Sequence, residues 1–229
     1  MFDREIKLIG LDNYNKLKNS TVAVIGLGGV GGYAVEALTR AGIGTIILVD
    51  YDVVDITNLN RQLISTTNNI GNKKTSEWKN RIASINPKCN VTVIDKFLTK
   101  DDISLIFNNY KVDYIIDACD TIEVKKELIN YTTLNNIGFI SSMGTGNKLY
   151  PSKLEITTLD KTSYDPIAKI LRKYVKDNKI NKKINVVCSI EAPKKIGSKN
   201  VASISTVPSV AGLLLASFII NSIINNWHK

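Results

Sequence analysis

Histidine and cysteine are scarce in this sequence of 229 residues. The single histidine, His228, is the last residue but one, so the sequence argues against a Ser-His-Asp triad or a histidine-bound metal. The three cysteines, Cys89, Cys119 and Cys188, lie far apart and form no C-x-x-C pair. This pattern excludes a disulfide framework and a zinc site of paired cysteines, and it predicts a reducing compartment, the cytoplasm.

The sequence also lacks a secretory signal segment at its start, where charged residues stand in place of an apolar run. Near the other end, residues 201–227 carry no charge, and the pattern predicts a strongly apolar helix over 209–224. Such a helix is just long enough to cross a membrane. The preceding Pro208 and the polar Asn221 within it favour a buried helix that covers a sheet, so we do not expect membrane contact.

A glycine-rich turn lies between two predicted strands in the first quarter of the chain. The β-branched run 22–25 predicts one buried strand, and 45–49 predicts the next. Between them the glycines fall at G-x-G-x-x-G spacing and open a helix over about 29–41. A phosphate can approach a backbone that has no Cβ, and the free N–H groups at a helix start favour an anion. Asp50 ends the second strand, where an acid can bind ribose hydroxyls. The candidate phosphate-binding glycines are Gly26, Gly28, Gly29 and Gly31.

Polar and basic side chains crowd the segment after Asp50. A nicotinamide dehydrogenase also has the glycine turn and the acid, but it needs little positive charge beyond them. An enzyme that receives a triphosphate and expels pyrophosphate needs cations and polar donors around the β and γ phosphates. Arg61 and Lys74 suit that role. The nucleotide-binding candidates of this segment are Asp52, Asn58, Arg61, Gln62 and Lys74.

Two acidic residues follow another predicted strand, over residues 112–116. Asp117 and Asp120 stand just beyond its end. That end is the carboxyl edge, where open α/β sheets bind ligands. Magnesium ions prefer one or two carboxylates together with phosphate oxygens. We therefore predict that Asp120 binds Mg²⁺, and we interpret Asp117 as a cap for the following helix.

These segments together resemble one enzyme family. The runs G-L-G-G-V-G, D-Y-D-V-V-D-I-T-N-L-N-R-Q and G-N-K-K are similar to those of the ubiquitin-activating-enzyme-like (ThiF/MoeB type) adenylating family, over about residues 1–145. Members make an acyl-adenylate from ATP and a carboxylate. The resemblance implies a homodimer in which Arg4 reaches the ATP of the partner subunit. It also implies that Asp50 binds the ribose, that Asn58, Arg61, Gln62 and Lys74 face the triphosphate, and that Arg61, Lys74 and Asp120 are catalytic.

Positive charge is concentrated in residues 161–200. This segment holds eleven Lys or Arg residues against three acidic ones, a net charge of +8 out of +9 for the chain. Asp165 and Pro166 predict a helix start, as cap and first helical residue. A basic amphipathic helix can be a solvated face or bind a membrane or nucleic acid. Because the charge is confined to forty residues, we predict a polyanion-binding surface. Its predicted contacts are Lys169, Arg172, Lys173 and Lys176.

The order of predicted elements indicates an α/β fold. Strands and helices alternate through the first half, which predicts a Rossmann-like, doubly wound, mostly parallel sheet. From Lys153 the apolar pattern alternates, as in an antiparallel strand. We expect an ATP-binding adenylation half, 1–147, and a half for substrate binding and dimerisation, 148–229. Both belong to one compact domain, with the apolar C-terminal helix covering the sheet.

The second half of the chain distinguishes between branches of the family. Its segment S-M-G-T-G-N-K-L-Y-P-S-K-L-E-I-T-T-L-D-K and the later V-P-S-V-A-G resemble the tRNA threonylcarbamoyladenosine dehydratases, which extends the resemblance to nearly the whole chain. This implies that ATP adenylates the carboxylate of the modified adenosine in tRNA, and that the activated group then cyclises. AMP and pyrophosphate are released. The basic segment fits a tRNA independently, because phosphate contacts dominate nucleic-acid affinity.

Two other interpretations stay open at this point. One is an adenylyltransferase that activates the C-terminus of a ubiquitin-like sulfur carrier, although such enzymes usually carry paired C-x-x-C zinc sites that this chain lacks. The other is an NAD-dependent oxidoreductase. A sulfur route would involve a cysteine desulfurase or another sulfur-transfer partner and a downstream thiol. Cys188 is the candidate thiol, and the simpler interpretation is a packed residue at a strand end.

Overall fold

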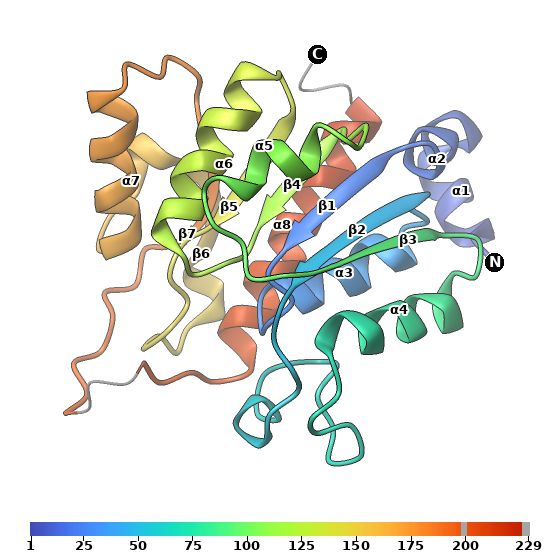
Figure 1. The fold of residues 1–229 in the computed structure, drawn as a ribbon, viewed down its shortest axis with the longest axis horizontal. Helices are drawn as coiled ribbons and strands as arrows, with labels where there is room; N and C mark the ends of the chain where they lie inside the picture. The colour runs from blue at the N-terminus through green and yellow to red at the C-terminus, as the bar shows by residue number, and fades with distance from the viewer. Residues whose placement is uncertain (198–200, 226–229) are drawn as a thin grey trace.

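The computed structural model describes residues 1–197 and 201–225, and these form an α/β fold around one sheet. Seven strands lie in the order β3-β2-β1-β4-β5-β7-β6 (Figure 1). All neighbouring strands are parallel except β6 and β7, which confirms the predicted mostly parallel sheet with an antiparallel extension. His228 and residues 198–200 of the basic segment lie outside the described residues. The strands are β1 (Thr21–Ile25), β2 (Thr45–Asp50), β3 (Asn90–Asp95), β4 (Tyr114–Asp117), β5 (Gly138–Ser142), β6 (Leu154–Thr158) and β7 (Asn185–Ser189).

Helices cover both faces of this sheet (Figure 1). Apolar side chains of α2, α3, α4 and α8 share one buried cluster, and those of α5, α6 and α7 share the other. Strands buried on both faces are expected to be near-continuous apolar runs, which is the pattern of β1, β2 and β4. The helices are α1 (Asp3–Ile9), α2 (Leu11–Lys18), α3 (Gly31–Arg40), α4 (Lys74–Ile85), α5 (Asp102–Phe107), α6 (Ile122–Leu134), α7 (Pro166–Asp177) and α8 (Thr206–Asn225), with short 3₁₀ turns η1 (Ile56–Asn58), η2 (Pro151–Lys153) and η3 (Leu159–Lys161).

The glycine turn between β1 and α3 is closely packed. A Cβ atom on Gly31 would lie 1.8 Å from the carbonyl oxygen of Gly26, a separation that no packing adjustment accommodates. Gly26 has a φ of 86°, and a Cβ there would lie 2.7 Å from the carbonyl oxygen of Ala118. Both positions therefore need glycine so that α3 can begin directly against the ends of β1 and β4.

Helix α8 packs against the sheet, as expected of a covering helix. Leu215, Ala216 and Ile219 are fully buried, in the cluster that α3 also joins. The helix is long and apolar enough to cross a membrane, but 56% of its apolar window is buried inside the protein. Core packing therefore accounts for its composition.

The second half of the chain extends the sheet of the first half. Strand β7 pairs in parallel with β5, and β6 pairs antiparallel with the outer side of β7. Between these two strands the chain forms α7, which begins at the Asp165 cap, as the sequence predicts. The Asp165 side chain accepts a hydrogen bond from the backbone N–H of Ala168. The start of α7 lies beside Gly144, just beyond the C-terminal end of β5.

Candidate functional site

A cavity of about 320 Å³ opens at the carboxyl ends of β1, β2 and β4. The strand order reverses at β1, and open α/β sheets bind ligands at such a switch point. The cavity brings together nearly all the nucleotide-binding residues that the sequence predicts. Its lining includes Gly26, Gly28, Gly29, Asp50, Asp52, Asn58, Arg61, Gln62, Lys74 and Asp120.

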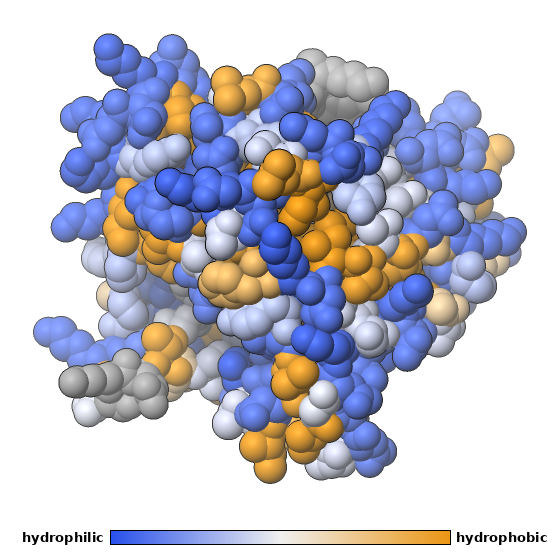
Figure 2. All heavy atoms as spheres, in the orientation of Figure 1, coloured by the Kyte–Doolittle hydropathy of each residue, from blue (hydrophilic) through white to orange (hydrophobic). Residues whose placement is uncertain are grey.

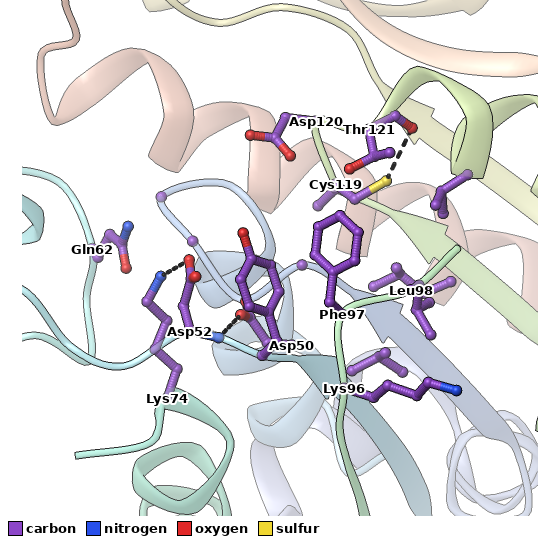
Figure 3. Close-up of a pocket in the computed structure, with 18 of the residues that line it drawn as sticks. Asp50, Asp52, Gln62, Lys74, Lys96, Phe97, Leu98, Cys119, Asp120 and Thr121 are labelled. Atoms are coloured by element: carbon purple, nitrogen blue, oxygen red, sulfur yellow. Dashed lines mark hydrogen bonds and ion pairs between the residues drawn. The ribbon is translucent and has the colours of Figure 1, made fainter. Parts of the chain in front are cut away.

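Asp50 connects the glycine turn to the end of β2. Its Oδ2 accepts a hydrogen bond of 2.6 Å from the backbone N–H of Leu27, and its Oδ1 accepts one of 2.8 Å from the N–H of Asp52 (Figure 3). Strands β1 and β2 are parallel neighbours, so the turn that follows β1 meets the end of β2 at the same edge of the sheet. The carboxylate is thereby fixed at the cavity wall, where a sugar hydroxyl can donate to it.

Lys74 and Asp52 form an ion pair at the wall of the cavity. The Nζ atom of Lys74 lies 2.8 Å from Oδ2 of Asp52 (Figure 3). The lysine side chain is only 4% exposed, whereas that of Asp52 is 44% exposed. Lys74 is the first residue of α4, and its backbone N–H donates to the carbonyl of Asp52 at 3.1 Å. A buried ammonium beside a single, half-exposed carboxylate can readily transfer its interaction to a phosphate.

The loop between β2 and α4 supplies further polar groups. Asn58 is buried, and its Oδ1 accepts from the N–H of Asp55 at 3.1 Å. Arg61 is held by its Nη1 atom, which donates to the carbonyl of Thr57 at 2.8 Å. Gln62 is only 7% exposed, and its buried Oε1 has no hydrogen-bond partner in the protein. An orphaned buried acceptor is costly, so it indicates a group that a ligand or its water satisfies.

Asp120 and Asp117 have different surroundings although they follow the same strand. Asp120 is exposed and lines the cavity (Figure 3). Asp117 is fully buried and pairs with Lys125, so the interpretation of Asp117 as a helix cap is wrong. The N-cap position of α6 belongs to Thr121 instead. No group of three or more His, Cys, Asp or Glu side chains able to hold a metal occurs among the described residues. Asp120 alone therefore suits a Mg²⁺ ion whose other ligands are phosphate oxygens and water.

Two aromatic rings at the cavity were missed by the sequence reasoning. Tyr51 and Phe97 line it, each 49% exposed, with ring centroids 4.8 Å apart in an edge-to-face arrangement (Figure 3). The carboxylates of Asp52, Asp120 and Asp50 raise the pKa of Tyr51, with Asp52 contributing most. The sequence could have indicated Tyr51, because it stands between the predicted site residues Asp50 and Asp52. Phe97 follows the end of β3, where nothing in the local pattern marks it.

Several predicted site residues do not line the cavity. Gly31 packs against Gly26 within the turn rather than at the cavity wall. Arg4 lies on α1, a helix with no buried residues. Cys188 is buried in β7, and burial raises the pKa of its thiol to about 11. Such a thiol is protonated at neutral pH and is a poor nucleophile.

The predicted basic contacts lie along α7, away from the cavity. Lys169, Lys173 and Lys176 are exposed, and Figure 2 shows hydrophilic side chains over this helix. Lys173 pairs with Asp177 at 2.5 Å, an exposed contact that water and salt weaken. Arg172 is partly buried, and its Nη1 donates to the carbonyl of Thr162 at 2.9 Å. The structure therefore gives Arg172 an internal contact that its three neighbours do not have.

Comparison with known proteins covers both halves of the chain. The model of the ThiF family matches residues 2–228. The tRNA threonylcarbamoyladenosine dehydratase of Bacillus subtilis is 40% identical, over 98% of this chain and 95% of that protein. That of Escherichia coli is 38% identical, over 77% of this chain and 66% of that protein. The crystal structure of the E. coli tRNA N6-threonylcarbamoyladenosine dehydratase in complex with ATP has a TM-score of 0.92 and 33% identity, covering 98% of this chain and 94% of that one.

Proposed function

The chain belongs to the ThiF family, and on this premise we propose that it is an ATP-dependent tRNA threonylcarbamoyladenosine dehydratase. The near-full-length match to the B. subtilis enzyme carries this proposal, because it includes the second half of the chain, to which we assign substrate binding. The cavity supports it independently. A carboxylate, a glycine turn and a buried lysine surround one space of a size that suits a nucleotide.

The kinds of side chain around the cavity support one orientation of a bound ATP molecule. Asp50 accepts from the ribose hydroxyls, and the rings of Tyr51 and Phe97 lie beside the base. The backbone N–H groups of the glycine turn and the start of α3 face the phosphates. Lys74, Arg61, Asn58 and Gln62 surround the β and γ phosphates. Donors placed where charge develops on the departing pyrophosphate lower the barrier to adenylation.

Asp120 is the residue that would hold a magnesium ion at this cavity. It is exposed, it lies at the carboxyl edge, and its carboxylate is the donor type that Mg²⁺ takes together with phosphate oxygens. A bound Mg²⁺ neutralises negative charge on the phosphates.

The reaction requires two substitutions and no protein nucleophile. An oxygen of the threonyl carboxylate attacks the α-phosphorus of ATP, and pyrophosphate leaves. A nitrogen or oxygen of the neighbouring carbamoyl group then attacks the acyl carbon, its proton is released, and AMP leaves with the former carboxylate oxygen. The net change in the nucleoside is the loss of one water. Intramolecular attack of this kind gains from proximity. Because the thiols of Cys119 and Cys188 are kept protonated by burial, we assign neither a covalent role nor a sulfur-transfer partner.

Three further assignments complete the proposal. The tRNA backbone lies along the exposed lysines of α7, where cations meet phosphates. The enzyme is a homodimer in which Arg4 reaches the ATP of the partner subunit. It works in the cytoplasm, where its tRNA substrate and reduced thiols are found.

ATP–pyrophosphate exchange tests the proposal against its alternatives. We expect exchange that depends on tRNA containing threonylcarbamoyladenosine. Exchange triggered instead by a small protein with a Gly-Gly end would indicate a sulfur-carrier adenylyltransferase. A protein that binds NAD and supports no exchange would indicate an oxidoreductase. Unmodified tRNA is the control, because it offers the same phosphates without the reacting carboxylate.

A further inference from the structure

Tyr164 adopts a backbone conformation that is unusual for its side chain. Its φ is 57°, in the left-handed region. For a bulky residue this region is a genuine outlier, since the side chain crowds its own backbone. The other non-glycine residues with positive φ among those described are two asparagines and a lysine, Asn136, Asn147 and Lys179. Tyr164 is thus the one aromatic side chain held in this way within the described residues.

The residues on both sides of Tyr164 fix this conformation. Asp165 is buried, its Oδ1 accepts from the N–H of Ala168 at 2.9 Å, and its Oδ2 accepts from the N–H of Gly144 at 2.9 Å. On the other side, the Thr162 carbonyl accepts from the Arg172 guanidinium. The partly buried Arg172 therefore holds the backbone two residues before Tyr164 through a hydrogen bond.

The strain at Tyr164 is not offset by burial of its ring. The residue is 66% exposed, more than most large apolar or aromatic side chains of this protein. Strain that persists without a gain in packing points to function rather than to stability. The hydrogen bonds of Asp165 and Thr162 hold the backbone on both sides of this exposed aromatic ring.

The segment that contains Tyr164 lies near the edge of the sheet at which the cavity opens. Gly144, which contacts Asp165, lies two residues beyond the end of β5, and β5 ends at the same edge of the sheet as the cavity. Lys169 is exposed in the second turn of α7. The backbone N–H of Lys194 donates to the carbonyl of Asn147 at 2.7 Å, which brings a second exposed lysine to the loop that begins at Gly144.

We propose that Tyr164 is a stacking platform for an unpaired base of the tRNA loop that contains the reacting nucleotide. This inference rests on the proposed function. Proteins that read single-stranded RNA splay bases onto exposed aromatic side chains, with cationic residues nearby for the phosphates. A rigidly presented ring costs little ordering entropy when a base stacks on it, so it fixes the loop while the modified adenosine enters the cavity.

The salt dependence of tRNA binding distinguishes base stacking from contacts between charged side chains and phosphates. Binding of tRNA containing threonylcarbamoyladenosine is measured by fluorescence anisotropy at several salt concentrations. Tyr164→Ala is expected to raise Kd about tenfold with an unchanged slope of log Kd against log salt. Lys169→Ala should instead reduce that slope by about 1. Tyr164→Phe and Tyr164→Trp should retain the affinity of the natural protein. Tyr110→Ala, which removes another exposed tyrosine, is the matched control and should change nothing.

A second variant distinguishes a binding role from a structural one. Tyr164→Gly removes the ring and relieves the positive φ, so Tm should stay the same or rise while Kd increases as in Tyr164→Ala. Asn136→Gly relieves a similar φ elsewhere and should leave Kd unchanged. The inference is overturned if Tyr164→Ala binds as tightly as the natural protein, if its salt slope falls, or if Tyr164→Phe fails to restore binding. Absence of any tRNA binding by the natural protein would instead overturn the proposed function itself.

Discussion

The ammonium of Lys125 lies 3.0 Å from Oδ2 of Asp117, and both side chains are almost completely closed to solvent. Lys125 also donates to Oγ of Ser141 and to the carbonyl of Ser142. Oδ1 of Asp117 accepts from the N–H of Cys119, in the turn that carries the magnesium candidate. The pair therefore joins the end of β5 to the turn beside the cavity.

Breaking this pair should destabilise the fold strongly. Lys125→Met leaves the Asp117 carboxylate buried without its cation, which costs about 3 to 5 kcal/mol of unfolding free energy. Urea denaturation measures the loss. The control is Lys173→Met on α7, where the ion pair with Asp177 is largely exposed and should be worth below about 1 kcal/mol. Equal effects of the two substitutions would contradict the role given to the buried pair.

Two of the cavity residues should be needed for chemistry and dispensable for folding. Arg61→Ala and Asp120→Ala remove charges that, in the proposed function, face the triphosphate, and each should lower ATP–pyrophosphate exchange by about 100-fold or more. Asp120 is exposed, and the hydrogen bonds that Arg61 donates to Thr57 and Asn60 are exposed too, so Tm should change little. Arg40→Ala, which removes an arginine paired with Glu36 on the surface, serves as the control. Undiminished exchange in both variants would refute the site assignment.

Alanine substitutions at two glycines of the motif should have different effects, one on folding and the other on ATP binding. Gly31→Ala places a methyl group 1.8 Å from a carbonyl oxygen and should prevent stable folding. At Gly28 the nearest atom to a Cβ is Nε2 of Gln62 at 3.6 Å, so Gly28→Ala should fold normally. Its methyl group occupies the approach of a phosphate, and ATP affinity should fall about tenfold or more. Thermal unfolding and ATP titration read the two effects separately. A folded Gly31→Ala variant would show that the turn is less closely packed than described.

The exposed lysines of α7 should set the salt dependence of tRNA binding. Neutralising Lys169, Lys173 and Lys176 together should weaken binding and reduce the salt slope by about 3, or roughly 1 for each phosphate contact. Arg172→Ala should reduce the slope less, because its guanidinium already bonds the Thr162 carbonyl. Affinity that stays the same at every salt concentration would count against this helix.

The buried thiol of Cys188 should make stability depend on alkaline pH. Burial raises its pKa to about 11, whereas the unfolded chain loses that proton near about 8.5. The unfolded state is therefore favoured progressively as pH rises from about 9 to 11. The unfolding free energy of the natural protein should fall more steeply over this range than that of Cys188→Ala. Identical slopes for the two proteins would show that the thiol titrates normally.

The order of motifs and predicted elements along the chain was enough to predict the glycine turn, the role of Asp50 and the class of the sheet. Each depends on neighbouring elements, as with Asp50, whose carboxylate bonds the turn before its own strand. Asp120 was predicted because the strand ends of a parallel sheet meet at one edge. Lys74 was predicted because a site that receives a triphosphate needs cations around the β and γ phosphates. The partner of Asp117 could not be read from the sequence, since Lys125 looks like any helix lysine until α6 is placed on the sheet. The backbone strain at Tyr164 likewise depends on contacts with Gly144 and Arg172, which are distant or ambiguous in the sequence.

Nucleoside analysis of tRNA tests the central claim most directly. Transfer RNA containing threonylcarbamoyladenosine is incubated with the protein, ATP and Mg²⁺, digested, and examined by mass spectrometry. We expect the modified nucleoside to lose the mass of one water, with AMP formed in equal amount. An unchanged nucleoside in the presence of protein that binds both ATP and the tRNA would contradict the account.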